Sequence, residues 1–306
     1  MTVRERRPTT FQTEAMVNLW SLGGLSWPEL IKRTWRETWQ DAVFGQAARL
    51  AFYHFLAIFP SLLLLFFLLV KLEATGPELR QIVMETFRQI LPPQVSGLIE
   101  ATINELNGRT DMGIAALPVV LSAVWAAVNG TWAMVTGLNT AYEVQEKRKL
   151  WKVLGLAFGL TVSLALMCLI SLLIILYGTR AAQVISQHFG AHPQPLFLLR
   201  VVQWPVLMAL LLAAFALLYR FGPNAQDRRW QWSTPGAVLA LILWLIATFL
   251  LREYFARFHS HEQIYGHLNS VVMLLMWFYF TGAAVLIGGE LNSEIEKAVE
   301  PRRTAS

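Results

Sequence analysis

The chain has 306 residues, of which 55% are hydrophobic and only 15% are charged, and its formal net charge is +5. Soluble domains usually contain about a quarter charged residues, so this composition excludes an ordinary soluble domain. The single cysteine, Cys168, excludes an intramolecular disulfide.

The N-terminal residues 1–25 are polar and lack apolar periodicity, and we interpret them as a disordered tail. A capping box follows, with Ser26 as the N-cap and Glu29 three residues later. The helix that it predicts carries Ile31, Trp35, Thr38 and Ala42 on one face, with Trp39 beside them and Lys32, Arg33 and Arg36 away from them. Tryptophan and arginine on one amphipathic helix are typical of an element that lies on a membrane surface.

Six apolar runs are each long enough to cross a hydrocarbon core about 30 Å thick, which takes roughly 20 helical residues. A backbone inside the bilayer must satisfy its own hydrogen bonds, which favours helices over open sheets. The sequence therefore predicts an all-α, polytopic integral membrane helical bundle, formed by a single domain over 26–297 with a short tail at 298–306. The predicted spans are about 47–70, 113–142, 151–177, 196–219, 234–256 and 268–290.

The only long connection follows the first span, over 71–112. Two stretches with apolar residues at helical spacing flank Pro92 and Pro93 in it, which predicts a two-helix cap over 77–107 on the outer face. Such a cap would suit docking of an envelope protein partner.

Positive charge is distributed unevenly across the predicted topology. The side that holds both termini carries 17 Lys and Arg residues and the other side 8, so the positive-inside rule places both termini in the cytoplasm. We assign the net charge to contact with anionic lipids of the inner leaflet and expect no nucleic-acid partner.

The second span contains a stripe of polar residues. At 100° per residue, one face collects Ser122, Asn129, Thr136, Asn139 and Glu143. The stripe has two interpretations. It joins helices by hydrogen bonds, or it lines a polar groove.

The first and sixth spans offer further candidates for lining such a groove. One face of the first span carries Gln46, Arg49, Tyr53 and Pro60. The sixth span aligns Asn269 and Glu290 with Met276, Phe280, Ala283, Ile287 and Glu294, and matched depth and charge suggest a Glu290–Arg49 ion pair. A second face of the sixth span, with Thr281, Ala284, Gly288 and Asn292, is small and predicts close packing, within one chain or between the chains of a homo-oligomer.

No motif for catalysis, metal binding or cofactor binding is found. His259, His261 and His267, with Glu262 between them, lack the spacing of a helical zinc motif, and we expect no metal site. Phosphate-binding loops, dinucleotide fingerprints and nucleophile elbows are not found either, so we expect no cofactor and no enzymatic activity.

Several segments together resemble the YihY/BrkB family of bacterial membrane proteins, once labelled ribonuclease BN. They are AARLAFYHFLAIFPSLLLL, LNTAYEVQEKRKLWK, LYRFGPNAQDRRWQWSTPGAVLALILW and IYGHLNSVVMLLMWFYFTGAAVLIGGELNSEIE, of which the last is the most specific. The resemblance covers roughly residues 30–297. It implies a six-helix protein of the bacterial inner membrane and a connection with envelope lipid traffic. The leading hypothesis is therefore that the protein moves or handles a lipid or another amphiphile in a groove lined by spans one, two and six, and the alternative is an envelope-assembly scaffold.

Overall fold

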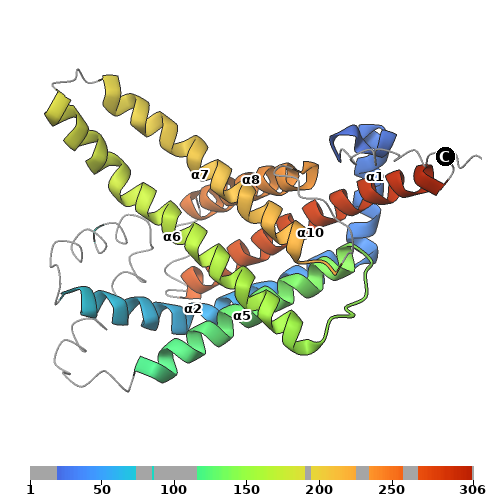
Figure 1. Cartoon of the computed structure of the whole chain (residues 1–306), viewed down its shortest axis with the longest axis horizontal. Coiled ribbons are helices and arrows are strands. Elements are labelled where there is room, and N and C mark those ends of the chain that lie inside the picture. The colour runs from blue at the N-terminus through green and yellow to red at the C-terminus, as the bar shows by residue number, and fades with distance from the viewer. Residues whose placement is uncertain are drawn as a thin grey trace, which may run out of the picture.

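A computed structural model describes residues 19–73, 85, 116–189, 194–224, 234–257 and 268–304. All regular structure in these ranges is helical (Figure 1), which confirms the predicted all-helical class for this part of the chain. The elements in chain order are η1 (Leu19–Gly24), α1 (Trp27–Gln40), α2 (Val43–Glu73), α5 (Ala116–Ala141), α6 (Leu150–Phe189), α7 (Gln194–Phe221), α8 (Pro235–Arg257) and α10 (Leu268–Thr304).

Each of the six predicted spans coincides with one of the long helices α2, α5, α6, α7, α8 and α10. Four of these helices are long and apolar enough to cross a membrane over their described residues, in the segments Leu150–Ile175, Val202–Phe221, Pro235–Tyr254 and Val271–Val299. Helices α2 and α5 are not among the four, so the count of six spans stays a prediction. The cap predicted over 77–107 lies outside the described residues, apart from Glu85.

Helix α10 is the central element of the bundle. It packs against α2, α5 and α8 along its length and against η1 and α1 near its C-terminal end (Figure 1). Helix α6 lies at the edge of the bundle, because its main contacts among the described residues are with α5 and α7 and 6% of its apolar segment is buried. Most of α6 therefore faces the surroundings, which for so apolar a helix means lipid.

Small residues allow α10 and α8 to approach each other closely. A Cβ atom at Gly288 would collide with the backbone carbonyl of Gly236, and one at Gly236 would collide with the carbonyl of Gly288. On the same side of α10, Thr281 accepts a hydrogen bond from the indole of Trp244 at 3.2 Å. The predicted small-residue face of the sixth span thus packs within the chain, against α8.

Helix α1 begins as predicted, with Ser26 as its N-cap, although the Ser26 side chain makes no capping hydrogen bond. The predicted stripe is divided between two faces, because Ile31 and Trp35 are exposed whereas Thr38 is buried. Thr38 is fully buried and donates a hydrogen bond to the carbonyl of Thr34 at 2.7 Å, while Leu30 packs on Leu291 and Ile295 of α10. The exposed face carries a stripe of large apolar side chains at helical spacing, namely Trp27, Ile31, Trp35 and Trp39.

The end of the predicted N-terminal tail is ordered. Residues 19–24 form η1, where Leu22 is buried and Gly23 has a positive φ of 61°. A Cβ atom at Gly23 would lie 2.8 Å from the Cβ of Ala298, so η1 rests directly on the last turns of α10. Residues 1–18 lie outside the described part of the chain.

Candidate functional site: an enclosed acid pair and an apolar groove

Two carboxyl groups meet between α1, α2 and α10. Glu290 of α10 has no exposed surface, and within the described part of the chain neither of its carboxylate oxygens has a hydrogen-bond partner. Asp41 lies in the turn between α1 and α2, close enough for its carboxyl group to interact with that of Glu290, and its buried Oδ2 atom also lacks a partner. We call Asp41 and Glu290 the acid pair.

The turn that carries Asp41 is fixed by the backbone. The amide of Asp41 donates to the carbonyl of Glu37 at 2.8 Å and ends α1, and Ala42 then adopts a positive φ of 49° before α2 begins. Gln46, one turn into α2, donates from Nε2 to the backbone carbonyl of Asp41 at 3.1 Å. Its buried Oε1 has no hydrogen-bond partner among the described residues, so Gln46 adds a fourth acceptor without a donor to the three of the acid pair.

A lysine near the acid pair is already engaged elsewhere. The Nζ atom of Lys297 donates to Glu143 at 2.7 Å and to Glu294 at 2.9 Å. Burial raises the pKa of the Asp41 carboxyl, and the nearby charge of Glu143 raises it further. Both effects disfavour a negative charge on Asp41.

A second polar network holds the connection between α5 and α6. Asn139 donates to Glu146 at 2.9 Å and accepts from the backbone amide of Asn224 at 2.7 Å. Arg148 donates to both carboxylate oxygens of Glu146, at 2.8 and 2.6 Å, and to the carbonyl of Gly222 at 3.0 Å. Asn139 was predicted to line a groove, and it joins α5 to the end of α7 instead. We call this side of the molecule, with the acid pair, η1 and the last turns of α10, the terminal end of the bundle.

The rest of the polar stripe on α5 does not meet the other predicted residues. Ser122 and Thr136 are exposed, and Asn129 is half-buried. The Asn129 and Thr136 side chains donate to carbonyls of their own helix, at 2.8 Å to Trp125 and at 3.0 Å to Trp132. Glu143, predicted to be in contact with water, is exposed. In a single chain this stripe is therefore an outer face of α5.

The residues of α2 that were predicted to line a groove lie in different surroundings. Gln46 lies beside the acid pair, and Tyr53 packs against the core. Arg49 is exposed, and since both oxygens of Glu290 lack partners, the predicted Glu290–Arg49 pair was wrong. The side chains of Pro60 and Asn269 lie outside the described residues.

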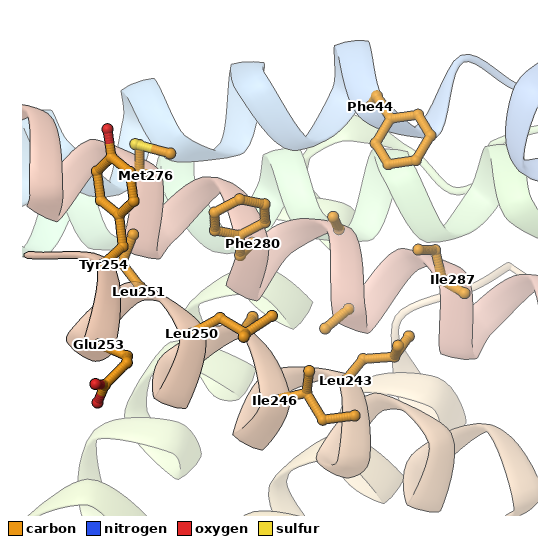
Figure 2. Close-up of a pocket in the computed structure, with 13 residues that line it drawn as sticks. Phe44, Leu243, Ile246, Leu250, Leu251, Glu253, Tyr254, Met276, Phe280 and Ile287 are labelled. Carbon is orange, nitrogen blue, oxygen red and sulfur yellow. The ribbon is translucent and has the colours of Figure 1, made fainter. Parts of the chain in front are cut away.

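An apolar groove of about 640 Å³ runs between α2, α8 and α10 (Figure 2). It uses the face of α10 that carries Met276, Phe280, Ala283 and Ile287, as predicted for the sixth span, but its opposite wall is α8 instead of α5. Figure 2 shows Phe44 and Ile287 near one end and Tyr254 and Glu253 near the other. Phe44 follows Asp41 by three residues and Ile287 precedes Glu290 by three, so the acid pair lies about one helical turn beyond that end.

Sequence reasoning missed Asp41 and the α8 wall. Asp41 is an acid directly before an apolar helix, which is a signal by itself, but only the α1–α2 turn brings it to Glu290. The lining residues of α8, such as Leu243 and Leu250, are ordinary apolar residues of a span and carry no local signal.

Comparison with known proteins now identifies the family. The sequence profile described as "Virulence factor BrkB" matches residues 34–306, which is most of the chain. The chain belongs to the virulence factor BrkB family. This confirms the resemblance seen in the sequence, and the matched part includes both members of the acid pair and all groove residues.

Three relatives each match most of the chain. The "Putative ribonuclease-like protein YfkH" of Bacillus subtilis is 29% identical over 253 residues, which are 83% of this chain and 90% of that protein. A "UPF0761 membrane protein" of Psychromonas ingrahamii is 26% identical over 274 residues, or 86% of each chain. A UPF0761 membrane protein of Xanthomonas campestris is 25% identical over 268 residues, but the match covers only 59% of that longer protein. No solved structure matches this BrkB-family chain.

Proposed function

We propose that this membrane protein binds a lipid or another amphiphile in the groove between α2, α8 and α10 and moves or otherwise handles it. The observation that carries the proposal is the groove itself. It is lined almost wholly by aliphatic and aromatic side chains, and two of its three walls are helices long and apolar enough to cross a membrane. Its volume of about 640 Å³ falls within the roughly 300–1,000 Å³ of ligand sites.

The surroundings favour an acyl chain as the occupant. The groove opens beside exposed apolar side chains of α8, among them Ile246 and Phe249, which a spanning helix presents to lipid tails. Glu253 and Tyr254 provide polar groups at one end, where a headgroup would lie. The proposal retains the predicted first and sixth spans as walls and replaces the second span by the fifth.

For orientation, we infer that the terminal end faces the cytoplasm of a bacterial cell. The support is the predicted six-span topology, which assigns 17 Lys and Arg residues to the side of the termini and 8 to the other side. The groove would then extend from the acid pair on the cytoplasmic side toward the outer leaflet.

The exposed stripe of α5 favours a second candidate function, that of a scaffold. Trp125 and Trp132 are exposed on the same face as Ser122 and Thr136. A membrane-embedded face that mixes aromatic and hydroxyl side chains suits contact with another helix, from a partner protein or from a second copy of this chain. In that case substitutions on the exposed face of α5 would impair the function of the protein, and substitutions in the groove would not.

Lipid retention after purification tests the proposed function. Native mass spectrometry of the detergent-purified protein should show bound phospholipid in the wild type. An Ala247→Trp substitution places an indole in the groove and should remove most of this lipid. The matched control is Ala165→Trp, on the exposed face of α6, which should retain the wild-type amount. Equal retention in both variants would overturn the proposal.

The ribonuclease-like name of the Bacillus relative defines a further outcome of the same experiment. If RNA cleavage copurified with the protein through several purification steps and disappeared in one point variant, the protein would be an enzyme and the lipid proposal would be wrong.

A further inference from the structure

The acid pair places two carboxyl groups where the nearby cation among the described residues, Lys297, is bound to two other acids. Glu290 is fully enclosed, and an ionised carboxylate in such surroundings needs a cation or several hydrogen-bond donors. Neither Glu290 oxygen has a donor, and Asp41 Oδ2 and Gln46 Oε1 add two further buried acceptors without one. Donors are therefore what this cluster lacks.

The charged groups that face the pair do not supply them. From α1, Glu37 adds a like charge, although Arg36 binds it at 3.0 Å. The end of α5 contributes Glu143, and α10 contributes Glu294 and Lys297. Because Lys297 is bound to Glu143 and Glu294, it balances those two acids and leaves Asp41 and Glu290 facing each other.

Two carboxylates in close proximity cannot both remain ionised away from water, and a single shared proton relieves their repulsion. We propose that Asp41 and Glu290 form a proton-binding site that holds one exchangeable proton between their carboxyl groups. The proton enters from the terminal end, because Asp41 is partly exposed whereas Glu290 is enclosed. No covalent step is involved, since a proton bound by the pair returns to water when it is released.

The ligand set favours a proton over a metal ion. Hard cations such as Ca²⁺ take six to eight oxygen ligands, whereas the cluster offers four unpartnered oxygens from three side chains. The described residues contain no group of three His, Cys, Asp or Glu side chains placed to hold a metal. A proton needs only the two carboxyl groups that already face each other.

The position of the site gives it a role beside the groove. Asp41 and Glu290 each lie about one turn from a groove residue of the same segment, Phe44 and Ile287. Gain or loss of the proton would change the charge at the end of the groove. The inference does not depend on what occupies the groove, and its test uses no lipid transport.

The first test measures thermal stability against pH for the purified full-length protein. A proton that the folded state holds and the unfolded state releases stabilises the folded state at low pH. This stabilisation is lost as the pH rises through the folded-state pKa of the pair. The wild-type melting temperature should therefore fall from mildly acidic to alkaline pH. Asp41→Asn and Glu290→Gln should each flatten this slope, and Glu29→Gln, at an exposed pair with Arg33, should leave it unchanged.

Infrared spectroscopy tests the proposal on the wild-type protein alone and so does not require that the variants fold. A C=O stretching band of a protonated carboxylic acid should be present at neutral pH and disappear at alkaline pH. Absence of this band at neutral pH, or an identical pH slope in all four proteins, would overturn the proposal. Stabilisation by Na⁺ or Mg²⁺ at constant pH and ionic strength, lost in Glu290→Gln, would overturn it in favour of a metal site.

Discussion

The hydroxyl group of Tyr219 donates a hydrogen bond to the backbone carbonyl of Val285 at 2.7 Å and so joins α7 to the middle of α10. Both residues belong to the main core, and Tyr219 is 2% exposed. The bond lies directly beside Gly288, where a Cβ atom would collide with the Tyr219 hydroxyl. One tyrosine and one glycine thus fix the distance between the two helices.

Loss of this hydroxyl should cost a measurable amount of stability. Tyr219→Phe removes one hydrogen bond and keeps the ring, so we expect a decrease of about 1 kcal/mol in the free energy of unfolding, the usual net value of such a bond. The melting temperature in detergent should fall accordingly. Tyr279→Phe is the matched control, because the Tyr279 ring packs on Phe280 at 5.4 Å and phenylalanine retains that contact. Equal effects of the two substitutions would contradict this account.

The glycine contact between α8 and α10 should tolerate no added methyl group. Gly288→Ala and Gly236→Ala each place a Cβ against a backbone carbonyl, which no rotamer change relieves. Overpacking of this kind costs typically 1–3 kcal/mol, and we expect a lower yield of monodisperse protein in size-exclusion chromatography.

The control is Gly159→Ala in α6, where a Cβ would meet nothing within 4 Å. Alanine stabilises an exposed helix by up to about 1 kcal/mol relative to glycine, so this variant should match or exceed the wild type. If Gly159→Ala were as harmful as Gly288→Ala, the α8–α10 contact would not be the cause.

The positions of the helices were predictable because the apolar runs and the turns between them are local signals, although α6 and α10 continue to Phe189 and Thr304, beyond the predicted ends at 177 and 290. The prediction for 234–256 and the observed Pro235–Arg257 differ by one residue at each end, since Pro235 suits a first helical position. The small face of α10 was also predictable. Close approach of backbones drives packing between membrane helices, so small residues indicate which face is buried.

The same rule explains why the polar stripe of α5 was placed on the wrong side in a single chain. The buried face of α5 carries small residues, including Gly130 and Gly137, and a Cβ at Gly137 would lie 2.9 Å from a methyl group of Leu286. The polar side chains had no need of an inward position, because Asn129 and Thr136 bond to their own helix. Hydrogen-bonding capacity was thus a weaker guide than side-chain size.

The acid pair could not have been found from spacing, because it joins residues 249 positions apart across a turn. Depth in the membrane suggested Arg49 as the partner of Glu290, but depth does not determine the angle around the helix axis. Leu50, about 100° further round α2, is the residue that packs on α10 at Gly282. Arg49 is consequently exposed.

Glu146 should make stability depend on acidic pH. Hydrogen bonds from Arg148 lower the pKa of Glu146 to about 2, against an ordinary value of 4.5. A group whose folded-state pKa is lowered stabilises above its unfolded pKa, and the contribution is lost as pH falls toward the folded value. The difference in melting temperature between the wild type and Glu146→Gln should be constant near neutral pH and shrink between pH 4.5 and about 2.

The partner of Glu146 provides the check on this prediction. Arg148→Ala removes the guanidinium hydrogen bonds and leaves those from the residue 148 amide and from Asn139, so it should lower the melting temperature already at neutral pH and reduce the acid-dependent difference between Glu146 and Gln. A difference that persists in full without the Arg148 side chain would assign the lowered pKa of Glu146 to another group.

The exposed tryptophan stripe of α1 should lie in the membrane interface. Trp35 is 57% exposed in the chain, and Trp27, Ile31 and Trp39 extend the same exposed face. Tryptophan side chains concentrate at the level of lipid headgroups, because one part of the ring is apolar and another binds water.

A spin label at Trp35→Cys, in a Cys168→Ala background and in lipid vesicles, should be more accessible to oxygen than to a water-soluble nickel chelate. Arg33→Cys, on the side of α1 away from the tryptophan stripe, should show the reverse preference. If both labels preferred the nickel chelate, α1 would lie in water, and the tryptophan stripe would need a protein partner to cover it.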